Sequence, residues 1–390
     1  MIYDNLNKKV ARIKDYQFNV TFINGAKVEV NGPENKEFNV KFFNNRTNEL
    51  IYNTFIKGNM WSSPSIQYFI EWRIEIYDVD NNKVYEHIFN ANKKRVFVNF
   101  ESKALGDTIS WFPYIEEFRK KHNCEIAVST FHNDWFKTKY PKIEFVKKGS
   151  VVYNLYAQYT IGWFYDGDNI NYNKVPINFR MNALGRTCSS ILGLEYKEIK
   201  PKLSFKNTGA LIDEPYICIA PHASALAKYW NYPGGWQELI NYFNSKNYKV
   251  MMITGEPLGD EWHDSKLGGT LEYVIDRTGK IPFEEIANDL MNAKAFIGVS
   301  SGLSWLSWAL GCPTTIISGF TQPLTEMKNC NRIFTPSPEI CNGCFSYHKL
   351  DAGDWKWCPE HKDTFRQFEC TKSILPSTVI NSLNKQLGIL

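Results

Sequence analysis

Residues 296–320, FIGVSSGLSWLSWALGCPTTIISGF, decide the fold class of this 390-residue chain. The apolar run 296–299 predicts a buried strand. Helical periodicity over 303–310 predicts a helix, which Gly311 and Pro313 would end. Residues 313–318 predict a second short strand. The order of strand, small-residue turn, helix and strand is typical of the crossover unit of a parallel α/β sheet.

The turn within this stretch, Ser300-Ser301-Gly302, is the first candidate binding site. Unpaired backbone N–H groups at the start of a helix attract an anion, and the helix dipole favours the same charge. The segment from Ser300 to Ser304 therefore predicts a cradle for a diphosphate. The alternative is that small residues only allow the strand and the helix to pack closely.

Alternating strands and helices extend from this turn over most of the chain. In the rear part, two strands alternate with two helices, at 216–224, 236–247, 248–257 and 283–295. An earlier series of strands and helices is predicted at 95–102, 108–123, 124–130, 131–140 and 151–160. The sequence therefore predicts an α/β protein with two Rossmann-like halves facing one another across a cleft, the plan of GT-B glycosyltransferases.

The front of the chain, residues 1–98, predicts an all-β region. Alternating apolar residues with turn signals at Asn24-Gly25 and at 80–82 predict hairpins in a small barrel or sandwich. Trp61 and Trp72 either serve recognition or belong to the core. The expected domains are an N-terminal β domain at 1–98, an acceptor-side domain at 99–210 and a nucleotide-sugar domain at 211–390, with a metal finger at 336–372.

Several charged and polar side chains follow predicted strands, where open α/β sheets bind ligands. Asp107, after the first strand of the front half, can act as general base on a hydroxyl, and it also suits a helix N-cap. In the rear half, Lys228 can hold a diphosphate, and Thr254 with Glu256 ends a strand where an acidic group can hold ribose. The alternative for each is a surface charge or a turn.

Four cysteines near the C-terminus predict a metal site. Cys341 and Cys344 form a C-x2-C knuckle, and Cys358 and Cys370 complete the ligand set of a tetrahedral zinc or iron site. Four thiolates leave no open position, which indicates a structural role. Metal binding would supply folding energy to a segment too short to bury a core. His348 and His361 are substitute ligands, and unrelated thiols are the alternative.

Composition limits the function classes. A net charge of +4 is too small to indicate nucleic acid or an anionic membrane as a partner. No apolar run reaches membrane-spanning length, and the first residues, MIYDNLNKKV, lack the apolar core of a signal peptide. We therefore expect a cytoplasmic protein whose nine cysteines do not form a disulfide framework.

Taken together, these motifs resemble a known family. Leu105-Gly106-Asp107-Thr108, Lys228 within AKYW, Thr254-Gly255-Glu256 and the opening stretch resemble the ADP-heptose glycosyltransferases. The β-rich front and the cysteine set narrow the resemblance to the bacterial autotransporter O-heptosyltransferases. Lipopolysaccharide heptosyltransferases usually show Asp-Thr-Gly-x-x-His where this chain has Ser300-Ser301-Gly302-Leu303-Ser304-Trp305.

The resemblance implies a function and a set of roles. It implies inverting transfer of heptose from ADP-heptose to serine residues of an autotransporter adhesin passenger domain by a large homo-oligomer. Asp107 matches the catalytic base. Donor contacts match Lys228, Thr254, Glu256, Ser300, Ser301, Gly302 and Ser304. The metal ligands match Cys341, Cys344, Cys358 and Cys370, which in that family hold iron, with zinc as the alternative.

Three other functions stay open at this point. A lipopolysaccharide-core heptosyltransferase would use a lipid-linked acceptor and a basic or apolar membrane-facing patch. A carbohydrate- or protein-binding module would bind ligands without releasing ADP. A nucleic-acid-binding zinc protein would need a basic stripe near the cysteines, which the sequence lacks.

Overall fold

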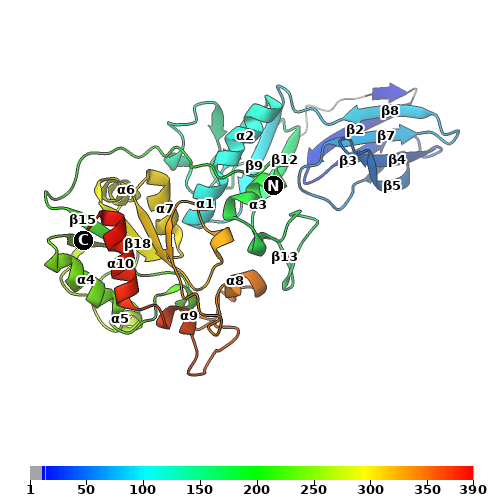
Figure 1. Ribbon diagram of the computed structural model, residues 1–390. Helices are drawn as coiled ribbons and strands as arrows, with labels where there is room; N and C mark the ends of the chain where they lie inside the picture. Colours follow the sequence, from blue (N-terminus) through cyan, green and yellow to red (C-terminus); the bar gives the residue numbers. More distant parts are fainter. Residues whose placement is uncertain (1–10, 14, 390) are drawn as a thin grey trace. The chain divides into compact units, whose positions relative to one another are not determined.

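The computed structural model describes residues 11–13 and 15–389 (Figure 1). They divide into two compact units. The first contains the described residues up to Lys103 together with 111–179 and 185–199. The second contains 104–110, 180–184 and the described residues from Lys200 onward. The predicted domain boundaries at 98 and 210 stay predictions.

The first unit contains a mixed sheet of eight strands. Its parallel part is β11-β10-β9-β12, and β12 also pairs in parallel with β2. The early strands therefore extend the α/β sheet. These strands are β1 (Ala11–Ile13), β2 (Tyr16–Ile23), β3 (Lys27–Asn31), β6 (Met60–Ser62), β9 (Arg95–Phe100), β10 (Glu125–Ser129), β11 (Ile143–Phe145) and β12 (Ala157–Ile161).

A second sheet in the first unit is antiparallel, in the order β5-β4-β7-β8. Its strands are β4 (Glu37–Asn44), β5 (Glu49–Lys57), β7 (Trp72–Tyr77) and β8 (Lys83–Ile88). Phe18 of β2 packs against Phe38 of β4 and Tyr85 of β8, so aromatic rings join the two sheets. A separate short hairpin pairs β13 (Tyr165–Asp166) with β14 (Asn169–Ile170).

The two predicted hairpins are confirmed. Strands β2 and β3 pair as far as Thr21 opposite Lys27, and residues 24–26 connect them. Asn24 and Gly25 in this connection both have positive φ angles, but it is longer than a two-residue turn. Strands β7 and β8 pair across residues 78–82. Trp72 is a core residue, whereas Trp61 is exposed and lies beneath the ammonium group of Lys27.

Two helix predictions in the front half were wrong in detail. The helix predicted at 108–123 is not one element, because helix α1 (Leu105–Trp111) already begins at Leu105 and ends at Trp111. Pro113 then starts a separate helix α2 (Pro113–His122), which packs on β10. The helix predicted at 131–140 is only a 3₁₀ turn, Asn133–Trp135. The next α-helix along the chain, α3, spans Leu184–Ile191.

The second unit contains a parallel sheet of six strands in the order β17-β16-β15-β18-β19-β20. The strands are β15 (Tyr216–Ala220), β16 (Lys249–Thr254), β17 (Ile275–Thr278), β18 (Ala295–Val299), β19 (Thr314–Ile317) and β20 (Asn331–Ile333). The helices are α4 (Gly235–Ser245), α5 (Glu261–Leu267), α6 (Phe283–Asn292), α7 (Gly302–Leu310), α8 (Cys344–Tyr347), α9 (Glu369–Lys372) and α10 (Pro376–Leu387). The strand-turn-helix-strand prediction for residues 296–320 is confirmed.

Helices cover both faces of this sheet. Helices α4 and α10 lie side by side, as do α6 and α7 (Figure 1). Ile217 and Ile219 pack in the same core as α4, whereas Tyr216 donates a hydrogen bond to the Asp289 carbonyl of α6. Because successive side chains of a strand point to opposite faces, the two helix pairs cover opposite sides of the sheet. Among the described helices, none is long and apolar enough to cross a membrane.

Candidate active site

The predicted donor-site residues lie along one edge of the second unit's sheet. Thr254 is the last residue of β16, Ser300 directly follows β18, and Lys228 ends a 3₁₀ turn that follows β15. These three strands are parallel neighbours, so their carboxyl ends meet at the same edge. The sequence prediction that these residues share one edge is therefore consistent with the sheet order.

The first turn of α1 packs directly against the first turn of α7. A Cβ atom added at Gly302 would lie 2.6 Å from the Leu105 Cβ, and one added at Gly106 would lie 2.8 Å from the Trp305 ring. Both glycines therefore permit an approach that any larger side chain would obstruct. This approach places Asp107, the third residue of α1, in the same compact unit as the predicted diphosphate turn.

Asp107 and Lys228 interact electrostatically in this unit. Asp107 is buried, with 8% of its surface exposed. The Lys228 ammonium group donates to the Ser224 hydroxyl at 3.1 Å and lies 5.1 Å from the centre of the Phe320 ring. Burial lowers the pKa of Lys228, and the Asp107 carboxylate partly opposes this shift. A carboxylate and a cation thus share one partly desolvated site.

The serines of the turn differ in what their hydroxyl groups contact. Ser304 is completely buried and donates to the Val299 carbonyl at 2.6 Å, which ties the helix to the preceding strand. Ser300 hydrogen-bonds to Thr321 at 3.1 Å. Ser301 occupies the N-cap position of α7 in an extended conformation, and its buried hydroxyl has no hydrogen-bond partner among the described residues. Of these three serines, Ser301 is thus the one whose hydroxyl has no hydrogen-bond partner among the described residues.

A buried ion pair, which the sequence does not predict, is linked by hydrogen bonds to the turn at 300–302. Glu326 pairs with Arg332 at 2.7 Å, and its carboxylate also accepts hydrogen bonds from Ser318 and Thr321. Thr321 in turn contacts Ser300. No sequence motif links these positions, because helix α7, strand β19 and a 3₁₀ turn separate Glu326 from the predicted turn along the chain.

A second missed residue is His222, which lies just beyond β15. Its Nδ1 atom lies 3.2 Å from the Thr254 hydroxyl and 3.8 Å from a Glu256 oxygen. Thr254 donates a short hydrogen bond to the same Glu256 oxygen. Burial lowers the pKa of His222, although the Glu256 carboxylate opposes the shift. A histidine after a strand is common in cores, so sequence alone gives no signal of this contact.

The four predicted metal-binding cysteines interact with one another. Burial together with the Glu369 carboxylate and the Cys358 thiol raises the pKa of Cys341 to about 11, and burial together with the Cys341 and Cys358 thiols raises that of Cys344 to about 12. Cys370 has a raised pKa for the same reasons, with contributions from the other three thiols. These mutual effects place the four thiols in one neighbourhood of the second unit.

Charged residues surround the Cys341 end of the cluster. Glu369 accepts a hydrogen bond from the Cys341 backbone N–H at 3.3 Å, and Arg366 grips its carboxylate through two nitrogens at 2.6 Å. Cys341, His361 and Glu369 have potential ligand atoms within 4.8 Å of one another. The predicted substitute ligand His361 therefore lies near the cluster, whereas His348 pairs with Glu360 at 2.8 Å.

The cysteine-bearing segment packs beneath the loop that carries Lys228. Phe320, which lies under the Lys228 ammonium group, contacts the rings of Phe345 and Trp357, both within that segment. The Trp355 carbonyl accepts a hydrogen bond from the Leu226 N–H at 3.2 Å. A structural change in the cysteine-bearing segment is therefore expected to alter the position of Lys228, the cation that is predicted to bind the diphosphate.

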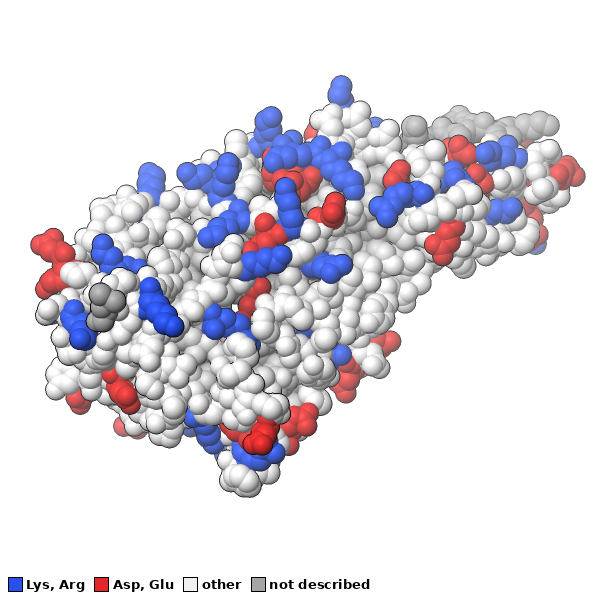
Figure 2. Space-filling view, viewed as in Figure 1, with Lys and Arg blue, Asp and Glu red and all other residues white. Residues whose placement is uncertain are grey.

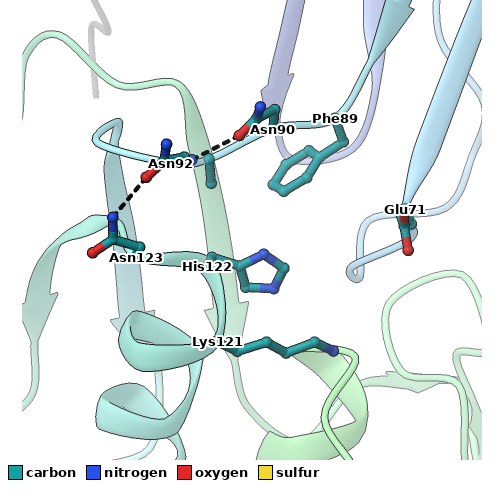
Figure 3. A pocket seen from close by; sticks show the side chains of 8 residues that line it. Glu71, Phe89, Asn90, Asn92, Lys121, His122 and Asn123 are labelled. Carbon is teal, nitrogen blue, oxygen red and sulfur yellow. Dashed lines mark hydrogen bonds between the residues drawn. The ribbon is translucent and has the colours of Figure 1, made fainter.

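A surface pocket of about 400 Å³ lies in the first unit, where the β8–β9 connection meets the end of α2 (Figure 3). Asn123, the left-handed C-cap of α2, donates to Asn92 at 2.7 Å, and Asn92 donates to Asn90 at 3.0 Å. These contacts tie the connection to the helix. The pocket precedes β9, so it lies at the sheet edge opposite the predicted ligand-binding edge.

The distribution of charge on the face shown in Figure 2 is mixed. Asp and Glu side chains are interspersed among Lys and Arg, and broad uncharged areas separate them. This mixture agrees with the small net charge of +4. The site itself combines a buried carboxylate, a partly desolvated cation and a helix N-terminus, a set that can accept a proton and stabilise a departing anion.

Comparisons with known proteins identify relatives with this architecture. The glycosyltransferase family 9 (heptosyltransferase) model matches residues 183–346. An autotransporter heptosyltransferase of Citrobacter rodentium is 33% identical over 381 residues, which is 95% of this chain and 88% of that protein. The iron-containing dodecameric glycosyltransferase TibC of enterotoxigenic Escherichia coli superposes with a TM-score of 0.87 at 31% identity, over 99% of both chains.

A second TibC structure, in complex with ADP-D-β-D-heptose, superposes with a TM-score of 0.85 at 30% identity, over 96% of this chain and 98% of TibC. Similarity of this extent covers both units and the cysteine segment together. The predicted family is therefore confirmed. This chain is a glycosyltransferase, and it belongs to the autotransporter heptosyltransferases within glycosyltransferase family 9.

Proposed function

We propose that this enzyme transfers heptose from ADP-heptose to serine hydroxyl groups of an autotransporter adhesin passenger domain, with inversion at the sugar carbon. The observation that carries the proposal is that buried Asp107 and Lys228 interact electrostatically in the compact unit where α1 packs on the first turn of α7. Relatives of matching length named as autotransporter heptosyltransferases, and the TibC complex with ADP-heptose, support the choice of donor.

The proposed reaction is a single displacement. The acceptor oxygen forms a bond to the anomeric carbon as the bond from that carbon to the diphosphate oxygen breaks. Asp107 accepts the acceptor's proton. Lys228 and the backbone N–H groups at Ser301 and Gly302 stabilise the negative charge of the departing ADP. Glu256 would hold the ribose hydroxyls.

Donor binding in this proposal relies on the remaining predicted residues in defined ways. Thr254 orients Glu256 through its hydroxyl group. Ser300 and Ser304 fix the shape of the turn through Thr321 and Val299. Ser301 offers its buried hydroxyl to the diphosphate. The turn would then act as one preorganised anion site.

We also propose that Cys341, Cys344, Cys358 and Cys370 bind iron, with zinc as the alternative. When bound, the metal would supply the bonds that hold this segment folded. The name of TibC as an iron-containing glycosyltransferase supports the choice of iron, and the mutual electrostatic influence of the four thiols supports a shared site. Ferric thiolate absorbs visible light and zinc thiolate does not, so the absorption spectrum of the purified protein distinguishes them.

Assembly and location complete the proposal. TibC is named as dodecameric, and we propose a large homo-oligomer for this chain as well. A heptosyltransferase that meets a passenger domain before its export would work in the cytoplasm. Light scattering of the purified protein measures the assembly, and a monomer would contradict this part of the proposal.

The test of function is transfer by Asp107→Asn. Wild-type protein mixed with ADP-heptose and a passenger domain should yield acceptor heavier by whole heptosyl units in intact mass spectrometry. Asp107→Asn should transfer roughly 10²- to 10⁴-fold more slowly, because general-base catalysis contributes about that much. Its affinity for ADP should persist or rise slightly, since a negative charge beside Lys228 is lost.

Two results would contradict the proposal. Transfer by Asp107→Asn at the wild-type rate would remove Asp107 from the reaction. Transfer to lipopolysaccharide core but not to the passenger domain would replace the proposed acceptor. Asp289→Asn is a matched control for the transfer rate. Asp289 is a buried carboxylate of the same unit, but it belongs to α6 and pairs with Arg277.

A further inference from the structure

A chain of three side chains links the core of the second unit to the proposed ribose site. The His222 Nδ1 atom lies 3.2 Å from the Thr254 hydroxyl, and that hydroxyl donates a short hydrogen bond to Glu256. His222 and Thr254 are buried, with 4% and 6% of their surfaces exposed. Glu256 is the partly exposed end of the chain, with 34% of its side chain accessible.

The hydroxyl of Thr254 fixes the direction of each hydrogen bond. A hydroxyl has one proton to donate and two lone pairs that accept. Thr254 donates its proton to Glu256, and the Glu256 backbone N–H approaches the oxygen at 3.5 Å. His222 must therefore donate to Thr254, which places the proton of the neutral imidazole on Nδ1.

The other nitrogen of His222 contributes no polar contact to this chain of hydrogen bonds. Its Nε2 atom is buried without a hydrogen-bond partner among the described residues. Its neighbours are the rings of Tyr229 and His263, at centroid distances of 5.8 Å and 5.6 Å. The hydrogen bond that the imidazole makes is therefore the one from Nδ1 to the Thr254 hydroxyl.

We propose that His222 is a positioning residue for recognition of the ribose hydroxyls of the donor nucleotide. It holds the Thr254 hydroxyl, which holds one oxygen of the Glu256 carboxylate and leaves the other oxygen directed at the ligand. This inference rests on the proposed function, because it takes Glu256 as the ribose contact. It adds a residue that no sequence motif of the chain marks.

The chain of hydrogen bonds predicts a specific loss of discrimination. Without the His222 donor, the Thr254 hydroxyl can rotate toward another acceptor, and the Glu256 carboxylate loses its fixed orientation. A hydrogen bond to a charged group contributes enough to change affinity by about tenfold. The loss should appear only for ligands that carry both ribose hydroxyls, because the phosphate contacts of Lys228 and the turn are untouched.

The test compares two substitutions of His222 with three ligands. Calorimetric titration measures the affinities of ADP, 2′-deoxy-ADP and 3′-deoxy-ADP for wild type, His222→Leu and His222→Asn. The Asn amide nitrogen can occupy the place of Nδ1, whereas Leu offers no donor. We expect wild type and His222→Asn to prefer ADP over the weaker deoxy ligand by about tenfold, and His222→Leu to lose most of that preference.

Thr254→Val provides an independent route if His222→Leu fails to fold. It removes the middle hydroxyl with little change in side-chain shape, so it should lose the same preference. In a His222→Leu/Thr254→Val double variant, the two losses should not add, because both substitutions break one chain. Additive losses would mean that the two residues act separately, which overturns the proposal.

The remaining outcomes separate this inference from the proposed function. Equal weakening of all three ligands in His222→Leu would mean a structural role and overturn the inference. So would an unchanged preference for ADP in that variant. If wild-type protein binds ADP no more tightly than the deoxy ligands, the inference about His222 is wrong, but the proposed heptose transfer is not contradicted. Wild-type protein that binds no ADP overturns the proposed function and this inference with it.

Discussion

Lys228 is the residue whose charge state most directly controls the proposed donor site. Its ammonium group is partly desolvated over Phe320, and its charged form is supported chiefly by Asp107. A bound diphosphate would supply far more compensating charge than Asp107 does. Binding of ADP should therefore raise the pKa of Lys228, and nucleotide affinity should depend on pH.

The sign of this dependence follows from the direction of the shift. The pKa of Lys228 in the free protein lies below its ordinary value of 10.5, and ADP binds the protonated form. Affinity should be constant below the free-protein pKa. It should fall by up to about tenfold per pH unit as the pH rises from the free-protein pKa toward the bound-state pKa.

Lys228→Arg is the matched variant for this prediction, because arginine stays charged throughout the range. Titration of ADP from about pH 7 to 10 should show falling affinity for wild type and a flatter profile for Lys228→Arg. Parallel profiles for the two proteins would mean that Lys228 does not carry the dependence.

Individual residues could be predicted only where a local pattern marks them. Asp107, Lys228 and Glu256 follow predicted strands, and the chemistry of their side chains is enough to indicate a role. His222 and Glu326 carry no such signal. Their contacts arise from neighbouring strands and a distant loop, and a single sequence does not specify which side chains those elements bring together.

At the scale of elements, the contact between α1 and α7 depends on the absence of a side chain at Gly302. A Cβ atom there would lie 2.6 Å from the Leu105 Cβ, so Gly302→Ala should push the helices apart. We expect a loss of about 1–3 kcal/mol in the free energy of unfolding, measured by urea denaturation, because overpacking a close contact costs that much.

Leu105→Ala should relieve part of this loss, because it shortens the side chain that the new methyl group would meet. The cost of Gly302→Ala should thus be smaller in the Leu105→Ala background. Gly255→Ala is the control, since its Cβ would meet open space, and it should change stability by less than about 0.5 kcal/mol. Equal costs in both backgrounds would contradict the close contact.

The metal segment gives a second prediction at this scale. Cys344→Ser should remove one ligand of the proposed metal site. It should also lower both the melting temperature and the affinity for ADP, because the segment supports Phe320 beneath Lys228. Metal analysis, thermal unfolding and ADP titration measure the three effects. Cys330→Ser is the control, since Cys330 lies outside the four-cysteine cluster and is only half-buried.

A variant that loses metal but keeps wild-type affinity for ADP would show that the segment does not support the donor site. Loss of metal in Cys330→Ser would instead contradict the assignment of the four ligands. The two outcomes can be read separately, because metal content and nucleotide affinity are measured on the same samples.

Elements were predicted best where periodicity is long and its ends are marked. The strand, turn and helix around Ser300 have an apolar run, small residues and a terminating glycine, so their bounds matched closely. The helix predicted at 108–123 was wrong at Pro113. Helical periodicity continues across this residue, but proline has no backbone N–H to donate to the preceding turn. The aromatic-rich segment 131–140 has similar periodicity but is stabilised by ring stacking, including Phe112 on Phe136.

At the scale of the whole molecule, the proposed base and the proposed diphosphate cation belong to one compact unit. Residues 104–110 follow a strand of the first unit but group with the second, where Lys228 and the α7 turn lie. Sequence reasoning assigned Asp107 to the front half, since it follows that half's first strand. Gly106 packs against Trp305 of α7, and residues 104–110 group with the second unit, while the predicted boundaries at 98 and 210 stay predictions.

The central claim is that Asp107, Lys228 and the first turn of α7 form one donor site. A crystal structure of the protein with bound ADP tests it most directly. We expect the diphosphate within hydrogen-bond distance of the Lys228 ammonium group and the N–H groups of Ser301 and Gly302. Glu256 should contact the ribose, and the Asp107 carboxylate should lie on the open side of the terminal phosphate. Nucleotide bound away from these residues, or Asp107 turned away from the terminal phosphate, would contradict the account.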